Sequence, residues 1–174
     1  AYYNPSNNEI VLPAGIFSVP GYADNELDDA LVYGYAAAST IGHEITHGFD
    51  DQGRQYDAKG NLYDWWTKKD AEEFSDRAKK IIAQFNEFIP IDTLHINGEA
   101  TQGENIADLG GMLIGLDAFK KTDTYKKNEK ISGYTPLQRY FLGYALGWLY
   151  KNRPESVASQ VMTDVHAPAI QRVN

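Results

Sequence analysis

Apolar side chains recur at helical spacing in four stretches of this chain, which we expect to form its long helices. These stretches cover residues 30–49, 71–88, 103–121 and 136–152. A shorter helix is expected near residues 155–162. The apolar stripe of the first helix, which we expect to face the core, comprises Leu31, Tyr35, Ala38, Ile41 or Gly42, Ile45 and Phe49.

Local signals mark where two of these helices begin. Thr135 supplies a capping hydroxyl, Pro136 suits the first helical turn, and Gln138 follows three residues after the cap. Thr67 with Asp70 is a weaker signal of the same kind. Both signals support the helical interpretation of the residues that follow them.

Residues 2–19 are typical of extended chain rather than helix. Two short apolar runs, residues 2–3 and 10–12, flank residues 4–8, which are rich in turn formers. We therefore expect two short strands, the first of them at an edge. An edge strand can bind an extended peptide by strand addition, although a purely structural hairpin explains this stretch equally well. The sequence thus predicts a mainly helical fold with a small β part at its N-terminal end.

Composition and charge narrow the class of protein. Hydrophobic residues make up 43% and aromatic residues 13% of the 174 residues, enough for one domain with a sizeable core. The net charge of −8 argues against nucleic acid or an anionic membrane as the partner. No apolar run approaches the roughly 18 residues of a membrane span. The sequence contains no cysteine, which favours a reducing compartment.

The candidate chemistry of the first helix lies in His43, Glu44 and His47. Residues four apart share one side of a helix, so both imidazoles can reach a single metal ion. Glu44 beside them can polarise a metal-bound water. With only four histidines in the chain, we take a zinc site as the working hypothesis. Asp50 or Asp51 can accept the outer ring proton of a ligand histidine, although solvation of the helix end explains them more simply.

Carboxylates and glycines in residues 103–121 point to the same site. Glu104 and Asp108 are four apart and share a helix face. Glu104 can be a third ligand, and Asp108 can accept a hydrogen bond from a ligand histidine. The alternative for Glu104 is a capping box with Thr101. A glycine inside a helix costs on the order of 1 kcal/mol relative to alanine, so repeated glycines indicate close approach of another backbone, for which the two-histidine helix is the natural candidate. These glycines are Gly110, Gly111 and Gly115.

Three residues near the C-terminal end stay open on the residues alone. Trp148 fits the core better than a pocket, because it continues the apolar spacing of residues 136–152. His166 and Arg172 are uninformative in isolation. In a metallohydrolase, either can steady an oxyanion or a substrate carbonyl.

The chain resembles the C-terminal catalytic part of neprilysin-type zinc metallopeptidases, family M13, which includes the bacterial PepO endopeptidases. The histidine–glutamate motif alone identifies only the wider class of zincins. Its combination with a glutamate-asparagine-x-alanine-aspartate motif 57 residues beyond His47 makes the resemblance specific. The matching segments are residues 1–3, 10–16, 42–53, 103–108 and 163–166.

This resemblance implies a thermolysin-like zincin fold, in which the active-site helix packs against a second helix that also bears a ligand. It implies one zinc ion per chain and hydrolysis of oligopeptides, preferably on the amino side of hydrophobic residues. The implied zinc ligands are His43, His47 and Glu104. Glu44 is implied as the general base, and Asp108 as the carboxylate that holds a zinc-bound histidine.

Five further residues acquire roles from the resemblance. His166 matches a histidine that stabilises the tetrahedral oxyanion, and Arg172 matches an arginine that docks a substrate carbonyl. Ala1 falls in a segment whose backbone pairs with the peptide. Ile16 and Trp148 fall where the family lines an apolar pocket for the residue after the scissile bond.

Several positions depart from the family pattern. The asparagine that precedes the Ala1 segment is absent, which removes a side chain that anchors substrate. Ala167 replaces a serine common beside the histidine, with little expected effect. Lys80 and Leu149 stand about where extracellular members have cysteines, so we expect a cytoplasmic bacterial protein.

The resemblance also bears on domain organisation. Residues 1–174 are expected to be a single, partial catalytic domain, without the N-terminal lid domain and the extreme C-terminus of the family. The partners expected are oligopeptide substrates and the N-terminal part of its own full-length protein. A truncated piece can instead be a non-catalytic fragment that binds zinc and peptides. A metal-free structural domain is the third interpretation.

Overall fold

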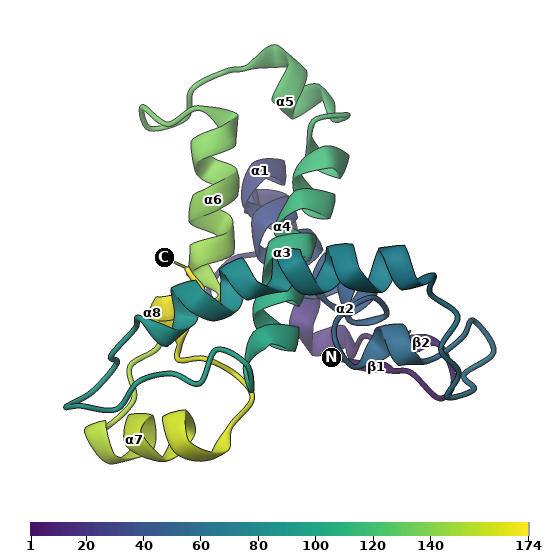
Figure 1. The fold of residues 1–174 in the computed structure, drawn as a ribbon. Coiled ribbons are helices and arrows are strands. Elements are labelled where there is room, and N and C mark those ends of the chain that lie inside the picture. The colour runs from purple at the N-terminus through teal and green to yellow at the C-terminus, as the bar shows by residue number, and fades with distance from the viewer. Residues whose placement is uncertain (174) are drawn as a thin grey trace.

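Helices form most of the regular structure, and a small sheet lies at one side (Figure 1). The structure, a computed structural model, describes residues 1–173. The strands are β1 (Tyr2–Asn4) and β2 (Glu9–Val11), and they pair antiparallel with Tyr3 opposite Ile10. The α-helices are α1 (Asp29–Val32), α2 (His43–His47), α3 (Lys68–Asn86), α4 (Gln102–Phe119), α5 (Asp123–Lys127), α6 (Pro136–Leu146), α7 (Pro154–Thr163) and α8 (Ala169–Arg172). The predicted fold class is therefore confirmed.

Other helical geometries complete the chain. Short 3₁₀ segments are η1 (Ala14–Phe17), η2 (Asp24–Glu26) and η4 (Gly53–Gln55), and η3 (Tyr33–Gly42) is a π-helix. Within residues 1–173, none of the helices combines the length and the apolar character that crossing a membrane requires.

One continuous helical run, formed by α1, η3 and α2, carries the two histidines. The apolar stripe expected on it is only partly buried, because Ile45 and Phe49 are 41% and 54% exposed. A π-helix hydrogen-bonds from i to i+5, so a stripe drawn at α-helical spacing turns away from the core before it reaches α2. The prediction for Ile45 and Phe49 is therefore wrong. His43 and Glu44 take the buried positions instead.

Helix α4 lies against η3 and α2 with backbone touching backbone. A Cβ added at Gly42 would stand 2.8 Å from the Cα of Gly111, and one added at Gly111 would stand 2.6 Å from the backbone nitrogen of His43. Real Cβ atoms do not come so close to other atoms, so both positions require glycine. The close approach that the glycines predicted is thus confirmed.

The main hydrophobic core lies where α1, η3, α4 and α6 meet. The rings of Phe119 and Tyr140 stack there with their centroids 5.8 Å apart. The Tyr140 hydroxyl donates a hydrogen bond to the Met112 carbonyl at 2.5 Å, which satisfies its buried polar end. The buried members of this core are Ala30, Ala38, Phe119, Tyr140 and Tyr144.

The start of α6 follows its predicted signal, but its end does not. The backbone nitrogen of Gln138 donates to Thr135 Oγ1 at 3.3 Å, and the Gln138 side chain accepts from the Thr135 nitrogen at 2.9 Å. The helix ends at Leu146 rather than near residue 152. Gly147 occupies the position after it, where the low helix propensity of glycine favours a stop.

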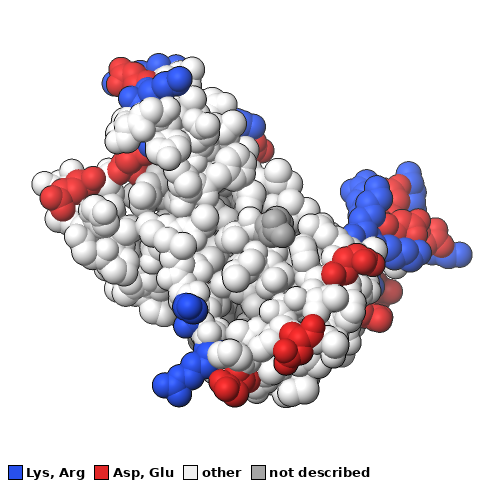
Figure 2. All heavy atoms as spheres, turned by 90° about the vertical axis from the view of Figure 1, so that its left-hand side faces the viewer, with Lys and Arg blue, Asp and Glu red and all other residues white. Residues whose placement is uncertain are grey.

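Charged side chains stand mainly at the margin of the face shown in Figure 2, in small groups of mixed sign. Exposed pairs of this kind include Lys69 with Glu73 at 3.7 Å and Lys79 with Asp76 at 2.8 Å, both on α3. Solvent screens such pairs, so they add little to the stability of the fold. The fold therefore depends on packing rather than on its surface ion pairs.

The substitution Gly111→Ala is expected to lower the free energy of unfolding by about 1–3 kcal/mol, because the added methyl group would push α4 away from the backbone of α2. Denaturant titration followed by circular dichroism measures the change. Gly15→Ala is the matched control, since a Cβ at Gly15 would meet nothing within 4 Å. Equal stability of the two variants would contradict the proposed contact.

Candidate metal centre

His43 and His47 direct the same ring nitrogen at each other. Their Nε2 atoms lie 3.0 Å apart on α2. The Nδ1 atom of His43 lies 2.9 Å from Asp108 Oδ1. The Nδ1 atom of His47 lies 2.7 Å from Asp50 Oδ2. An Nδ1 that donates its proton to a carboxylate leaves Nε2 with a lone pair, so two acceptors face one another. This donor set suits a cation bound by both nitrogens.

Glu104 on α4 closes the third side of this group. Its Oε2 lies 3.3 Å from Nε2 of His43, and its Oε1 lies 3.5 Å from Nε2 of His47. Tetrahedral ligands at about 2.0–2.1 Å from a zinc ion stand about 3.3 Å from one another. The separations in this chain therefore fit a zinc site with three protein ligands. The alternative role of Glu104 in a capping box is not realised, because no side chain caps α4 and Thr101 Oγ1 donates to the Asn97 carbonyl instead.

Glu44 lies beside His43, His47 and Glu104 but is not one of the three candidate ligands. It is 7% exposed, and its carboxylate belongs to a group with both histidines whose ligand atoms lie within 4.8 Å of one another. Helix α2 directs it into the same cleft as His43 and His47. A carboxylate in this position can accept a proton from a water molecule held between the ligands.

Asp108 links the metal centre to Arg172. The Arg172 Nε donates to Asp108 Oδ2 at 2.6 Å, and Nη2 donates to Asp108 Oδ1 at 2.8 Å. The same Nη2 lies 3.4 Å from Glu104 Oε2. The guanidinium carbon stands 4.2 Å from the centroid of the Trp148 ring. Arg172 thus offsets the negative charge of two carboxylates behind the histidines.

These contacts shift the ionisation of the buried groups. Burial lowers the pKa of His43, but its hydrogen bonds and attraction to Asp108 and Glu104 outweigh that effect and raise the pKa to about 9. Burial raises the pKa of Asp108, yet hydrogen bonds from His43 and Arg172 prevail and lower it. The pKa of Glu104 is lowered in the same way, against its burial, by His43, His166 and His47. Both carboxylates therefore remain charged at neutral pH.

Asp50, rather than Asp51, holds His47. The second oxygen of Asp50 accepts hydrogen bonds from the backbone nitrogens of Gln52 at 2.8 Å and Gly53 at 2.7 Å. Asp50 is 4% exposed, so it belongs to the interior and not to a solvated helix end. Burial raises the pKa of the neighbouring Asp51, whose Oδ1 lacks a hydrogen-bond partner in the described chain. The three-residue spacing after His47 was the signal for Asp50, but it did not separate the two aspartates.

A cleft of about 370 Å³ opens over the two histidines. One wall is the β1 segment, and the other is formed by α2 and the turn after it. His166 reaches the cleft with its side chain 47% exposed. Its Nε2 lies 3.3 Å from Glu104 Oε2, and its Nδ1 lies 2.7 Å from Asp164 Oδ1. The cleft is lined by Ala1, Tyr2, Tyr3, Pro5, His43, Glu44, His47, Asp50, Gln52, Gly53, Glu104 and His166.

Three residues that sequence comparison with the family suggested for substrate binding do not line this cleft. Ile16 lies in η1, and Trp148 packs beside Tyr144 with centroids 6.1 Å apart. The Arg172 side chain is 5% exposed and is held by Asp108. Asp164 has no predicted role, although its position two residues before His166 lets it hold that ring.

Comparison with known proteins agrees with this geometry. The model of peptidase family M13 matches residues 1–174. The chain belongs to family M13. Among curated proteins, it is 40% identical to Neprilysin-11 of Caenorhabditis elegans and 41% identical to Endothelin-converting enzyme 1 of Rattus norvegicus. Among solved structures, it superposes on the Mycobacterium tuberculosis zinc metalloprotease Zmp1 with a TM-score of 0.87 at 42% identity. PepO from Lactobacillus rhamnosis superposes with a TM-score of 0.85 at 38% identity.

Each match covers nearly all of this M13 chain but a small part of the other protein. The two curated relatives are covered over 21% and 23% of their length, and 99% of this chain takes part. The two solved structures are covered over 27% and 25% of theirs. The M13 chain thus spans about a quarter of the proteins it resembles.

The substitution Asp50→Asn is expected to weaken zinc binding about 10–100-fold, because an amide holds the His47 ring less firmly than a carboxylate and adds no negative charge. Competition with a chromogenic chelator measures the affinity. Asp76→Asn serves as the control, since Asp76 lies exposed on α3 and pairs with Lys79. Unchanged zinc affinity in Asp50→Asn would contradict a role for this carboxylate.

Proposed function

We propose that this M13 chain is the zinc-binding, catalytic part of an endopeptidase that hydrolyses oligopeptides. The main support is the convergence of His43 Nε2, His47 Nε2 and the Glu104 carboxylate, whose Oε2 and Oε1 lie 3.3 and 3.5 Å from the first and second nitrogen. A solved relative is described as a zinc metalloprotease, which agrees with this donor set. We therefore assign His43, His47 and Glu104 as the ligands of one zinc ion. When bound, zinc would lower the pKa of a water molecule and polarise the scissile carbonyl.

Glu44 is assigned as the general base. Its carboxylate accepts a proton from the attacking water, whose oxygen bonds to the carbonyl carbon of the peptide. The same proton then passes to the amine nitrogen as the carbon–nitrogen bond breaks. Glu44 is 7% exposed. This burial supports the role, because a site with little water strengthens the electrostatic interactions of a carboxylate.

His166 and the β1 edge are assigned to the substrate. In its doubly protonated form, His166 donates through Nδ1 to Asp164 at 2.7 Å and can donate from Nε2 to the oxygen that becomes negative during attack. Ala1 and the outer edge of β1 line the cleft, and β2 occupies only the other edge, so the backbone can pair with an extended peptide. Arg172 commits two nitrogens to Asp108, so its contact with a substrate carbonyl is left to its remaining terminal nitrogen.

A preference for an apolar residue after the scissile bond completes the proposal. It rests on the resemblance of Ile16 and Trp148 to pocket residues of the family, since neither lines the described cleft. Cleavage of a peptide library, followed by mass spectrometry of the products, identifies the preferred position.

A non-catalytic module that binds zinc and peptides is the second candidate. The chain spans only 21–24% of the length of the first curated relatives. The isolated chain can therefore bind zinc and peptides without being catalytic. It requires the zinc ligands but gives no role to Glu44, so variants of Glu44 distinguish the two candidates.

The substitution Glu44→Gln is expected to reduce kcat/KM by about 10²–10⁴-fold, because glutamine cannot accept the proton of the attacking water. Hydrolysis of a quenched fluorescent peptide by the protein as it is naturally encoded measures the rate. The zinc content should stay the same in both proteins. Glu72→Gln, on the exposed face of α3, is the control. Equal hydrolysis by Glu44→Gln and wild type would contradict the role of Glu44 as base, and no hydrolysis by either protein would leave only the binding module.

Removal of zinc is expected to lower the melting temperature. A ligand present at 100 times its dissociation constant stabilises the folded state by about 2.7 kcal/mol, and a chelator removes that contribution. Differential scanning calorimetry with and without a chelator, followed by re-addition of zinc, measures the change. A metal-free structural domain would melt at the same temperature in all three conditions.

A further inference from the structure

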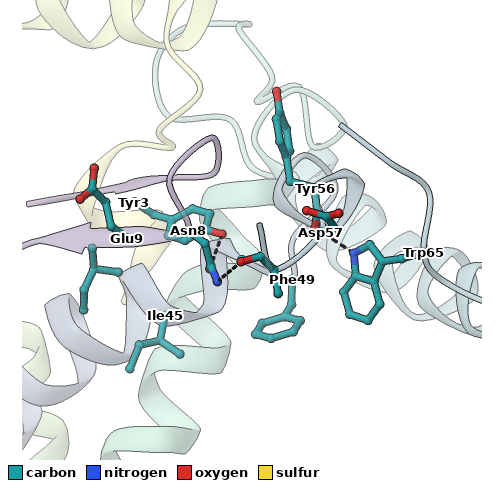
Figure 3. A pocket seen from close by; sticks show the side chains of 11 residues that line it. Tyr3, Asn8, Glu9, Ile45, Phe49, Tyr56, Asp57 and Trp65 are labelled. Atoms are coloured by element: carbon teal, nitrogen blue, oxygen red, sulfur yellow. Dashed lines mark hydrogen bonds between the residues drawn. The ribbon is translucent and has the colours of Figure 1, made fainter. Parts of the chain in front are cut away.

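Tyr3 lies next to a second, larger cavity as well as the metal cleft. This mainly apolar pocket has a volume of about 490 Å³, and Tyr3 lines it together with Asn8 and Phe49 (Figure 3). Its walls include Ile10 of β2, Ile45 of α2, and Phe49 and Trp65 beyond the end of α2. Tyr3 is a lining residue of both cavities. Tyr3 therefore stands where the two cavities adjoin.

The Tyr3 ring rests on the end of the helix that carries the histidines. A Cβ placed at Gly48, the residue after His47, would stand 3.4 Å from the Tyr3 hydroxyl oxygen and 3.5 Å from Cζ. These are contact distances for an added methyl group, so the phenol lies over Gly48 with room for about one methyl group between them. At this place β1 lies next to α2.

A chain of two hydrogen bonds holds the ring in that position. The Tyr3 hydroxyl donates to Asn8 Oδ1 at 3.2 Å, and Asn8 Nδ2 donates to the carbonyl of Ala58 at 3.3 Å (Figure 3). Burial and the negative charge of Asp50 raise the pKa of Tyr3, so the hydroxyl keeps the proton that it donates. Asn8 thus joins the hairpin to the loop at residues 57–61 and holds the Tyr3 ring beside the end of α2.

We propose that Tyr3 is a positioning residue, which sets the height of the β1 edge above His43 and His47 and closes the metal cleft toward the apolar pocket. This inference rests on the proposed function in one respect, namely that the cleft receives a peptide along β1. An extended peptide must pair with β1 and present one carbonyl to the metal centre at the same time. The distance between β1 and α2 decides whether both contacts can form.

Two consequences follow for substitutions at this position. Tyr3→Ala removes the ring that stands where the two cavities adjoin and lies over Gly48, so β1 loses its fixed height and the two cavities join. Tyr3→Phe keeps the ring and loses only the bond to Asn8. Peptides long enough to pair with β1 should be affected by Tyr3→Ala, whereas short peptides that reach only the metal centre should not.

The experiment measures peptide binding without turnover. The protein as it is naturally encoded, loaded with zinc and carrying Glu44→Gln, is titrated with a fluorescein-labelled octapeptide and a labelled dipeptide, and fluorescence anisotropy gives the dissociation constants. In this background, Tyr3→Ala should weaken the octapeptide about 10-fold or more and the dipeptide less than about 3-fold. Tyr3→Phe should stay within about 3-fold for both peptides. Tyr22→Ala is the control, because Tyr22 is 63% exposed and lines neither cavity.

Tyr3→Leu protects the test if Tyr3→Ala does not fold, since leucine retains apolar bulk without reaching Gly48 in the same way. It should behave like Tyr3→Ala toward the octapeptide while its zinc content matches that of wild type. Equal weakening of both peptides, no weakening of either, or a loss in Tyr3→Phe as large as in Tyr3→Ala would overturn the inference.

The failure of the proposed function gives a different result. A wild-type protein that binds the octapeptide with the expected Tyr3 dependence but does not hydrolyse it would refute the peptidase and leave the positioning role intact. A wild-type protein that hydrolyses peptides, with equal effects of Tyr3→Ala on long and short ones, would refute the positioning role alone. Absence of binding by either peptide to the zinc-loaded protein would refute the positioning role as well.

Discussion

Two lone pairs, held 3.0 Å apart on the Nε2 atoms of His43 and His47, govern the rest of this structure. They face one another because a carboxylate occupies the opposite nitrogen of each ring, Asp108 for the first and Asp50 for the second. Two acceptors at this distance repel unless a cation lies between them. Burial lowers the pKa of His43, but hydrogen bonds and attraction to Asp108 and Glu104 raise it to about 9, so the ring holds a proton at neutral pH where no metal is bound. Metal and proton therefore compete for one position.

Two carboxylates one helical turn apart on α4 hold the His43 ring from both sides. Residues four apart rise about 6 Å along a helix, and Glu104 and Asp108 use that rise to reach opposite nitrogens of the His43 ring. Glu104 stands 3.3 Å from Nε2, and Asp108 stands 2.9 Å from Nδ1. Such a clamp requires α4 to run very close to α2, and the contact of Gly42 with Gly111 permits this. Arg172 then offsets the charge of both carboxylates, at 2.6 Å from Asp108 and 3.4 Å from Glu104.

Local spacing explains what could be predicted from the sequence and what could not. The four-residue intervals of the two helices depend only on helix geometry, so the proximity of His43, His47 and Glu104 could be predicted. The exposed positions of Ile45 and Phe49 were missed because a π-helix leaves no clear mark in the order of apolar residues. The choice of Asp50 over Asp51 depends on two backbone nitrogens in the following turn. Both aspartates follow His47 at helical spacing, so the sequence pattern does not show which of them the turn will select.

The two walls of the cleft depend on different contacts. The wall formed by α2 and α4 is held by backbone packing and buried carboxylates, and any change there disturbs the nitrogens of the metal centre. The wall formed by β1 belongs to a hairpin of two three-residue strands, which is too short to be stable alone. It is held instead by Tyr3 over Gly48 and by Asn8 on the carbonyl of Ala58. Because these contacts do not involve the histidine side chains, the β1 wall can change while the wall of α2 and α4 keeps its geometry.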